Sequence, residues 1–444
     1  MTSAAEFNED PNLPAEDRSM FASLKVRDYL FVWIGMLGSA FAMNMQLVAQ
    51  GWLVYEMTTS ALQLTWVTLA FMLPQVVFSL AGGVLADRVK KKPLIGWSPI
   101  ANGLITLGMA YIILGGHVTF WDFIWVGFFN GTIMALSIPA RTALIPEIVG
   151  DRLMFNAMAF NTASWNLSRI LGPALAGFMI AMIAGGDTTS TFGVGMVYVV
   201  LSVLYLTSGI SVLFIKHAGD PVPGERKSPL NDIKEGLGYV FRSPIVGGLI
   251  LLSIMPFLFG LSINTLLPAF NRDVLAGGPD DLGLLMTAMG VGAIAGSLVL
   301  AKLGALRHKG YWLMASTAAW GLGVTSFALT HSFYWSFVAI GVVGFVSSIN
   351  MSMNRSLVQL QVAQNMRGRV MSIDLMSHGL MPIGILPIGY IAEKVSVEAG
   401  LATSGIILFL VSIILCLVLE QVRRIDTGYR TPAGKGGEAQ RAML

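Results

Sequence analysis

Long apolar stretches, separated by short polar connections, recur along almost the whole chain. A helix needs ~20 predominantly apolar residues to cross the hydrocarbon core of a bilayer, where only a helix or a closed barrel satisfies its own backbone groups. We therefore predict an all-α membrane protein with twelve transmembrane helices in two six-helix halves. The expected spans are 30–56, 61–86, 94–115, 120–140, 155–184, 196–216, 244–269, 281–303, 311–330, 333–354, 370–392 and 400–420.

One long basic connection separates the sixth span from the seventh. It contains Pro221, Pro223, Gly224 and Pro229, and then a short amphipathic segment, 230–241, for which we expect a place on the cytoplasmic membrane face. This connection divides the chain into two halves of six spans. The expected parts are an N-terminal tail (1–27), the N-terminal half (28–216), the linker (217–243), the C-terminal half (244–424) and a C-terminal tail (425–444).

Composition and charge agree with a membrane protein. Hydrophobic residues make up 55% of the chain, charged residues only 12%, and the mean hydropathy is +0.70. These values exclude a large soluble catalytic domain. If both termini are cytoplasmic, 25 of the 28 lysines and arginines fall on the cytoplasmic side. This asymmetry predicts that orientation and an even number of helices.

Several classes of function find no support in the sequence. The basic residues are dispersed over many loops, so no nucleic-acid surface is expected. Cys416 is the single cysteine, the five histidines are scattered, and no spacing typical of metal ligands or of a phosphate-binding loop occurs. We therefore expect no metal and no cofactor. A membrane-embedded enzyme would need a clustered nucleophile, base or metal, which the sequence does not offer.

The connection after the second span resembles a known transporter signature. Residues 83–92 read Gly-Val-Leu-Ala-Asp-Arg-Val-Lys-Lys-Lys and look like the Gly-x3-Asp-Arg-x-Gly-x-basic-basic loop of the major facilitator superfamily. Lys90 departs from the second glycine of that signature. The corresponding connection in the second half, Arg307-His308-Lys309, lacks the acidic residue.

Three further blocks resemble one subgroup, the bacterial exporters related to the enterobactin exporter and the macrolide efflux proteins. These blocks are residues 139–147, 161–173 and 367–372, and the resemblance covers about 21–424. It implies the major facilitator fold and a monomer in the bacterial inner membrane. It also implies alternating-access export of a small amphipathic organic molecule of siderophore or drug type, with proton antiport as the expected coupling. The partners would be this substrate, protons and the lipid bilayer.

Asp87, Arg88 and Arg141 are the candidate gating residues. A carboxylate at a helix end can pair with an arginine or with a helix N-terminus, and breaking that pair would release one half to move. The resemblance suggests Arg141 as the partner of Asp87. The alternative is that the basic cluster only fixes topology and Asp87 neutralises part of it.

Arg169 lies midway along the fifth span, where a charge costs at least ~2.5 kcal/mol on insertion scales and normally faces protein or water. Helical spacing places Asn161, Trp165, Arg169 and Gly172 on one face, which could bind an anionic or hydrogen-bonding substrate. The alternative is an arginine satisfied by backbone carbonyls near the helix break at Pro173.

Amides mark two other spans. Gln46 and Gln50 share one face of the first span, and Asn350 and Asn354 share one face of the tenth. We expect them to line a substrate cavity, although buried amides also bind neighbouring helices.

Asp374 and His378 lie four residues apart on the eleventh span, and burial could bring either group toward neutral pH. This pair is the candidate proton carrier. The alternative is an interfacial ion pair in which Asp374 neutralises Arg367 or Arg369. The fourth span also lacks the internal arginine that many proton-coupled relatives carry.

Other transport functions stay open at this point. An importer or a lysophospholipid flippase of the same fold would show the same pattern of spans. A transport-inactive membrane receptor would show it as well.

Overall fold

The computed structural model describes residues 21–185, 191–220, 229–303, 308–363, 366–377 and 380–425. Within these ranges the chain is helical and has no strand, which confirms the predicted all-α class. Contacts divide the chain into two compact units. Unit 1 comprises the described residues of Met1–Thr59, Trp66–Glu225 and Gly277–Thr287; unit 2 comprises those of Ser60–Thr65, Arg226–Ala276 and Ala288–Leu444.

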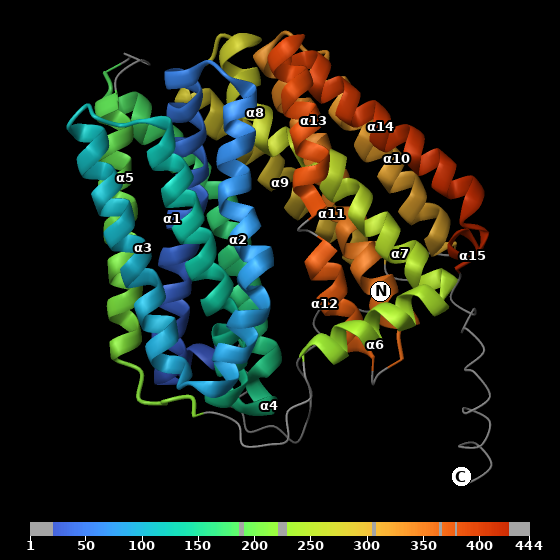
Figure 1. Ribbon diagram of the computed structural model, residues 1–444, viewed down its shortest axis with the longest axis horizontal. Coiled ribbons are helices and arrows are strands. Elements are labelled where there is room, and N and C mark those ends of the chain that lie inside the picture. Colours follow the sequence, from blue (N-terminus) through green and yellow to red (C-terminus); the bar gives the residue numbers. More distant parts are fainter. Residues whose placement is uncertain are drawn as a thin grey trace. The chain divides into compact units, whose positions relative to one another are not determined.

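The long helices of unit 1 follow one another along the first half of the chain (Figure 1). They are α1 (Arg27–Thr58), α2 (Ala61–Arg88), α3 (Lys91–Leu114), α4 (Phe120–Ile183) and α5 (Thr191–Leu213), after a short 3-10 turn, η3 (Ser23–Lys25). Thr119 and Asp122 form a capping box at the start of α4. Gly150 interrupts α4 with φ 67° and ψ 171°, a backbone conformation that favours glycine. The kink divides α4 into two spans.

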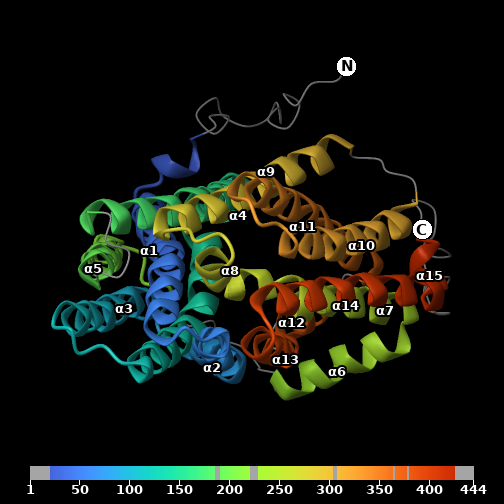
Figure 2. The ribbon, with the colours of Figure 1, turned by 90° about the horizontal axis from the view of Figure 1, so that it is seen from above.

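Small residues let the helices of unit 1 approach closely. α1 packs against α4 and α5, and α3 packs against α5, so α3 and α5 lie side by side in both ribbon views (Figures 1 and 2). A Cβ added at Gly35 of α1 would lie 2.6 Å from the hydroxyl oxygen of Ser211 in α5. Ser211 in turn donates to the carbonyl of Phe31 at 3.1 Å. Such small and hydroxyl residues are typical of helix interfaces in membranes, where close packing drives association.

Unit 2 contains more and shorter helices. They are α6 (Pro229–Arg242), α7 (Pro244–Met255), the π-helix η4 (Pro256–Gly260), α8 (Ser262–Asp273), α9 (Pro279–Leu303), α10 (Lys309–Ala328), α11 (Phe333–Gln361), α12 (Arg367–Ser377), α13 (Met381–Lys394), α14 (Val397–Val418) and α15 (Glu420–Arg423). α10 packs against α14, and α6 packs across α12 and α7. The contact of α10 with α14 repeats the contact of α3 with α5, because each joins the third expected span of its half to the sixth.

Each unit includes a short piece from the other half of the sequence. Residues 60–65, the start of α2, belong to unit 2, where Ser60 donates to Oε2 of Glu393 at 2.9 Å. Residues 277–287, which include the start of α9, belong to unit 1, where the Thr287 hydroxyl donates to the carbonyl of Ile170 at 2.9 Å. Sequence order alone therefore does not assign every residue to its unit.

Ten helical segments among the described residues are long and apolar enough to cross a membrane. They coincide with ten of the expected spans. The expected span at 311–330 coincides with α10, which is not among the ten, and the span at 370–392 is divided between α12 and α13. Pro382 stands in the first turn of α13. Backbone N–H groups there have no acceptor within the helix, so the N–H that proline lacks costs no helical hydrogen bond. The membrane-spanning helical fold is confirmed, and the count of twelve stays a prediction.

Candidate functional site

A cavity in unit 2, mainly apolar with several polar side chains, gathers several of the predicted site residues. Its volume is about 160 Å³. α7, η4, α11 and α12 form its walls, so segments more than a hundred residues apart in sequence meet there. The lining residues are Ser253, Pro256, Phe257, Asn350, Met351, Ser352, Asn354, Arg355 and Asp374.

The wall made by α7 and η4 exists because the helix changes its winding at Pro256. Leu261 donates to the carbonyl of Pro256 at 3.0 Å, five residues back, which is the hydrogen bond of a π-helix. The segment ends at Gly260, where a Cβ would lie 2.8 Å from Cε2 of the buried Trp320. Single-turn π-helices occur frequently at functional sites. Here the altered winding places Pro256 and Phe257 at the cavity.

α11 brings both predicted asparagines to the cavity, as their spacing of four residues requires. Asn350 is buried, and its amide donates to Thr317 Oγ1 at 2.8 Å, to Ser316 Oγ at 2.9 Å and to the Leu313 carbonyl at 3.3 Å. Its donors therefore bind α10 instead of pointing to a ligand. Asn354 is 4% exposed, and its Oδ1 makes no hydrogen bond with the described residues. Asn354 therefore has an unused acceptor at the cavity.

Asp374 provides the carboxylate of the cavity. It is only 7% exposed, although it lies just two turns into α12. Arg367 donates to the Gln359 carbonyl at 2.9 Å, and Arg369 bonds Glu235 at 2.9 Å, so pairing of either arginine with Asp374 stays a prediction. Arg355 lines the same cavity as Asp374. His378, the other half of the predicted pair, lies outside the described residues.

The predicted polar stripe on α4 belongs to unit 1. Gly172 contacts α1, since a Cβ there would lie 2.9 Å from Cβ of Asn44. Arg169 is exposed within the unit and makes no hydrogen bond or ion pair with the described residues. Trp165 is half-buried, and Oδ1 of Asn161 is buried without a hydrogen bond to any described residue. The stripe thus offers one unused cation and one unused acceptor.

The glutamines of α1 bind each other. Nε2 of Gln46 donates to Oε1 of Gln50 at 3.4 Å, and the Tyr205 hydroxyl of α5 donates to Oε1 of Gln46 at 3.5 Å. Both distances are long for hydrogen bonds, so these groups are weakly held. Gln46 is buried and Gln50 is half-buried.

The gating candidates lie near the far end of α2 and in α4. The side chain of Asp87 lies outside the described set, so its pairing with Arg141 stays a prediction. Arg88 ends α2 and is exposed. Nε of Arg141 is buried and has no hydrogen-bond partner among the described residues.

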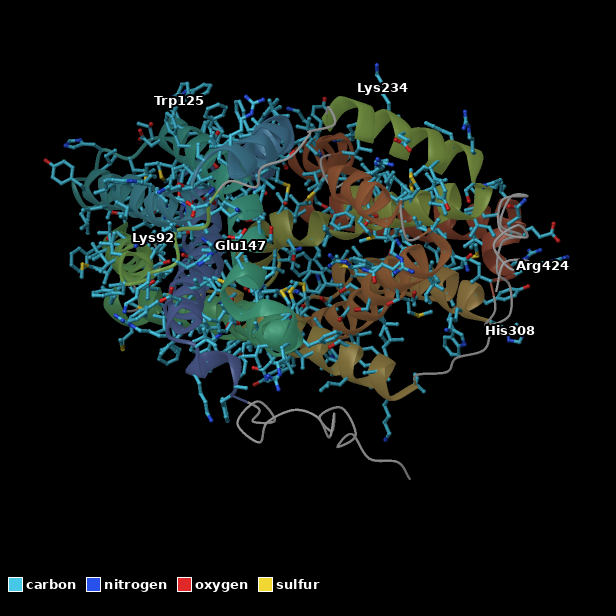
Figure 3. All side chains as sticks on the ribbon, turned by 90° about the horizontal axis from the view of Figure 1, so that it is seen from below. Lys92, Trp125, Glu147, Lys234, His308 and Arg424 are labelled. Atoms are coloured by element: carbon cyan, nitrogen blue, oxygen red, sulfur yellow. The ribbon has the colours of Figure 1, made fainter. Side chains whose placement is uncertain are left out.

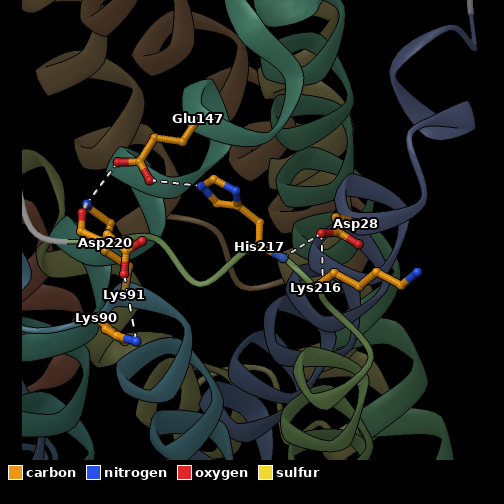
Figure 4. Close-up of polar contacts among 7 residues, drawn as sticks. All are labelled: Asp28, Lys90, Lys91, Glu147, Lys216, His217 and Asp220. Atoms are coloured by element: carbon orange, nitrogen blue, oxygen red, sulfur yellow. Dashed lines mark hydrogen bonds and ion pairs between the residues drawn. The ribbon is translucent and has the colours of Figure 1, made fainter.

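An ion cluster that was not predicted from the sequence lies beside the connection between α2 and α3 (Figure 4). Lys91, only 2% exposed, contacts Glu147 Oε1 at 2.8 Å through Nζ, and Nζ also donates to the Asp220 carbonyl at 3.0 Å. His217 contacts the other oxygen of Glu147 at 3.3 Å. The cluster joins the start of α3 and a turn of α4 to the chain that leaves α5. A sequence signal was present, because Lys91 stands in the loop 83–92 that resembles the superfamily signature and Glu147 ends the block 139–147 that resembles the exporters.

The same chain caps α3. The backbone amides of Lys91 and Lys92 donate to the carbonyls of Gly219 and Ala218 at 2.9 and 3.2 Å. These are two of the amides that a helix start leaves without an internal partner. Gly219 has φ +64°, and a Cβ there would lie 2.7 Å from Leu144 Cδ1 and 2.8 Å from Lys91 Cβ. We call residues 217–220, with these contacts, the linker strap.

Comparison with known proteins identifies the family. The family MFS_3, described as a transmembrane secretion effector, matches residues 18–433. The chain belongs to this family. The transporter is 25% identical over 397 residues to the enterobactin exporter EntS of Shigella boydii serotype 4 (strain Sb227), which covers 88% of this chain and 90% of the relative. The enterobactin exporter of Escherichia coli O1:K1 / APEC is 25% identical over 348 residues, 78% of this chain and 80% of the relative.

Solved structures agree on the fold. The nucleoside transporter NupG matches this transporter with a TM-score of 0.67 and 14% identity, over 90% of this chain and 100% of the other. A bacterial homolog of the human lysosomal transporter Spinster, inward-facing and occupied, matches with a TM-score of 0.70 and 10% identity, over 90% and 99%. The family match and the exporter relatives show that the protein is a multi-pass membrane transporter of the major facilitator superfamily and not an enzyme.

Proposed function

We propose that this transporter exports a small amphipathic organic molecule, of siderophore or drug type, by alternating access and in exchange for protons. The family and the two enterobactin exporters support export as the direction. The observation that carries the coupling is the unit 2 cavity, where the buried carboxylate of Asp374 lies with Arg355 and Asn354. In this proposal Asp374 carries the coupling proton, and His378 assists it.

A buried carboxylate that lines a cavity suits a proton carrier. In this proposal Asp374 takes up the proton in one state of the cavity and releases it when the surroundings of the carboxylate change. Substrate or proton arrival at the cavity would provide that change.

The test is transport in proteoliposomes with Asp374→Asn. We expect the variant to lose accumulation driven by a pH gradient, while exchange of substrate at equal concentrations on both sides continues. Glu420→Gln is the matched control, because Glu420 is exposed and its one ion pair with the described residues is to the exposed Arg424, four residues on. A panel of labelled siderophores and drugs, tested with and without a protonophore, supplies the substrate.

Two results would overturn the proposal. Full pH-driven accumulation by Asp374→Asn would remove the coupling role. Transport that depends on the phospholipid headgroup and ignores the pH gradient would instead indicate a lysophospholipid flippase.

Arg169 is the proposed anchor for acidic groups of the substrate, with Asn161 and Trp165 beside it. An exposed arginine without a partner in its unit, on a helix that crosses the membrane, needs water or a ligand to satisfy its donors. Gln46 and Gln50, on α1 of the same unit, would then orient the rest of the substrate. Arg169→Gln should raise the KM for anionic substrates more than for neutral ones. Equal changes for both classes would leave Arg169 a purely structural role.

The gate is proposed at Asp87, Arg88 and Arg141. Reversal of the charge at Asp87 should abolish transport without loss of membrane insertion. Normal transport by that variant would contradict the gate. We further propose that the protein is a monomer of the bacterial inner membrane with both termini in the cytoplasm, which cysteine labelling at the termini from either side of sealed vesicles tests.

A further inference from the structure

The linker helix α6 exposes an apolar strip beside basic side chains. Phe241 is 81% exposed and Leu237 is 42% exposed, and the two lie one turn apart on the same side. Lys234 and Arg242 are also exposed, and Figure 3 shows Lys234 projecting outward. Neither basic side chain makes a hydrogen bond or ion pair with the described residues. This face of α6 therefore exposes apolar side chains to water and has basic side chains without a partner among the described residues.

The opposite face of α6 is already occupied. Gly236 lies so close to α12 that a Cβ would be 2.8 Å from Ile373 Cδ1 and 3.2 Å from Arg369 Cβ. Glu235 bonds Arg369 at 2.9 Å, and the Tyr239 hydroxyl accepts from the amide of Ala363 at 3.3 Å. These contacts fix the rotation of α6 about its own axis. The apolar strip must consequently face away from the rest of unit 2.

Connectivity places α6 at the membrane boundary. Only Ser243 separates Arg242, the last residue of α6, from Pro244, the first residue of the span 244–273. The corner is held, because the amide of Ser243 donates to the Tyr239 carbonyl at 3.0 Å. The C-terminal end of α6, which carries Phe241 and Arg242, therefore lies within a few ångströms of the lipid headgroups, given a rise of ~3.5 Å per extended residue.

We propose that α6 is a lipid-binding helix of the membrane surface. Phe241 and Leu237 enter the interfacial layer, and Lys234 and Arg242 bind the phosphates of anionic phospholipids in the bilayer that holds the transporter. An amphipathic helix with an aromatic residue and basic residues at its edges binds that layer by combining apolar burial with attraction to negative headgroups. The ligand is an anionic phospholipid headgroup.

The first experiment measures the depth of α6. Leu237→Cys in a Cys416→Ser background carries a nitroxide, and full-length protein is reconstituted in vesicles of phosphatidylglycerol and phosphatidylethanolamine. We expect the label to collide more often with oxygen than with a water-soluble nickel chelate, whereas a label at the exposed Lys216 shows the reverse order. Faster collision with the chelate at Leu237, as for a helix in water or under a protein partner, would overturn the proposal.

The second experiment tests the headgroup. Raising phosphatidylglycerol from none to one third of the lipid should shift the Leu237 label deeper and reduce its mobility. Lys234→Gln with Arg242→Gln should remove this response, and the matched control, Lys302→Gln with Lys394→Gln, should keep it, because those exposed lysines lie on other helices of unit 2. An unchanged response in the α6 variant would refute headgroup binding. Neither measurement requires transport, so failure here is separate from failure of the proposed function.

Discussion

Replacement of Lys91 by methionine removes a buried cation at the centre of the ion cluster in unit 1. Its Nζ contacts Glu147 at 2.8 Å and the Asp220 carbonyl at 3.0 Å, so the variant loses one ion pair and one charged hydrogen bond. The side chain of Glu147 is 30% exposed and still contacts His217, so water and His217 solvate the carboxylate that remains. We expect a loss of about 2 kcal/mol, below the 3–5 kcal/mol of a pair broken in a dry interior.

Glu147→Gln should cost more, about 3 kcal/mol, because it leaves the buried ammonium of Lys91 with only neutral partners at close range. The double variant should cost clearly less than the two single losses together, since each single variant strands the other charge. Lys90→Met is the matched control. Its contact with Asp220 is 3.8 Å long and exposed at both ends, so that variant should change little.

The measurement is resistance to unfolding of purified protein in detergent, followed by loss of the monodisperse peak with temperature and by a double-mutant cycle in denaturant. We expect the loss of unfolding free energy to be largest for Glu147→Gln, smaller for Lys91→Met and smallest for Lys90→Met. A Lys90→Met variant as unstable as Lys91→Met, or losses that simply add in the double variant, would refute the reasoning.

Three further outcomes follow from packing. Gly344→Ala should lower the yield of folded protein and cost roughly 2 kcal/mol or more, because the new methyl group meets the backbone of Met289; Gly108→Ala, with open space at its Cβ, should not. Gly219→Ala should destabilise the linker strap and speed hydrogen exchange at the amides that start α3, and unchanged exchange would contradict the strap. Asn350→Leu should cost about 2 kcal/mol in the same unfolding assay through its lost bonds to α10, while substrate affinity stays near that of the parent; a selective loss of affinity would show that this amide binds substrate.

The helices were predictable because apolar length is a local property of the chain. The exceptions are places where the backbone changes within an apolar run. Pro256 and Pro382 both stand inside apolar runs, so hydropathy predicts one continuous helix at each. It does not distinguish the π-helix at Pro256 from the new helix start at Pro382. The two expected spans 120–140 and 155–184 match the two segments on either side of the kink at Gly150, and only their ends differ.

The site was predictable one residue at a time and not as an arrangement. Asp374 and Asn354 were found because a polar group within an apolar span is costly and needs a reason. Arg355 directly follows the expected span 333–354 and carries no such signal, and its place in the same cavity as Asp374 depends on how α11 and α12 pack. Lys91 was treated as one of three equal lysines. Helical periodicity does not reveal that one of the three turns inward to Glu147 while its neighbour stays in water.

The linker strap also limits how far the connection between the halves can reach. Its last residue, Asp220, is held by the side chain of Lys91, and α6 begins at Pro229. Nine residues of fully extended chain span at most about 32 Å. Throughout the transport cycle the start of α6 must therefore stay within that distance of Asp220, at the α3 N-terminal end. This limit is relaxed only if the contact between Lys91 and Asp220 breaks and the free connection becomes longer.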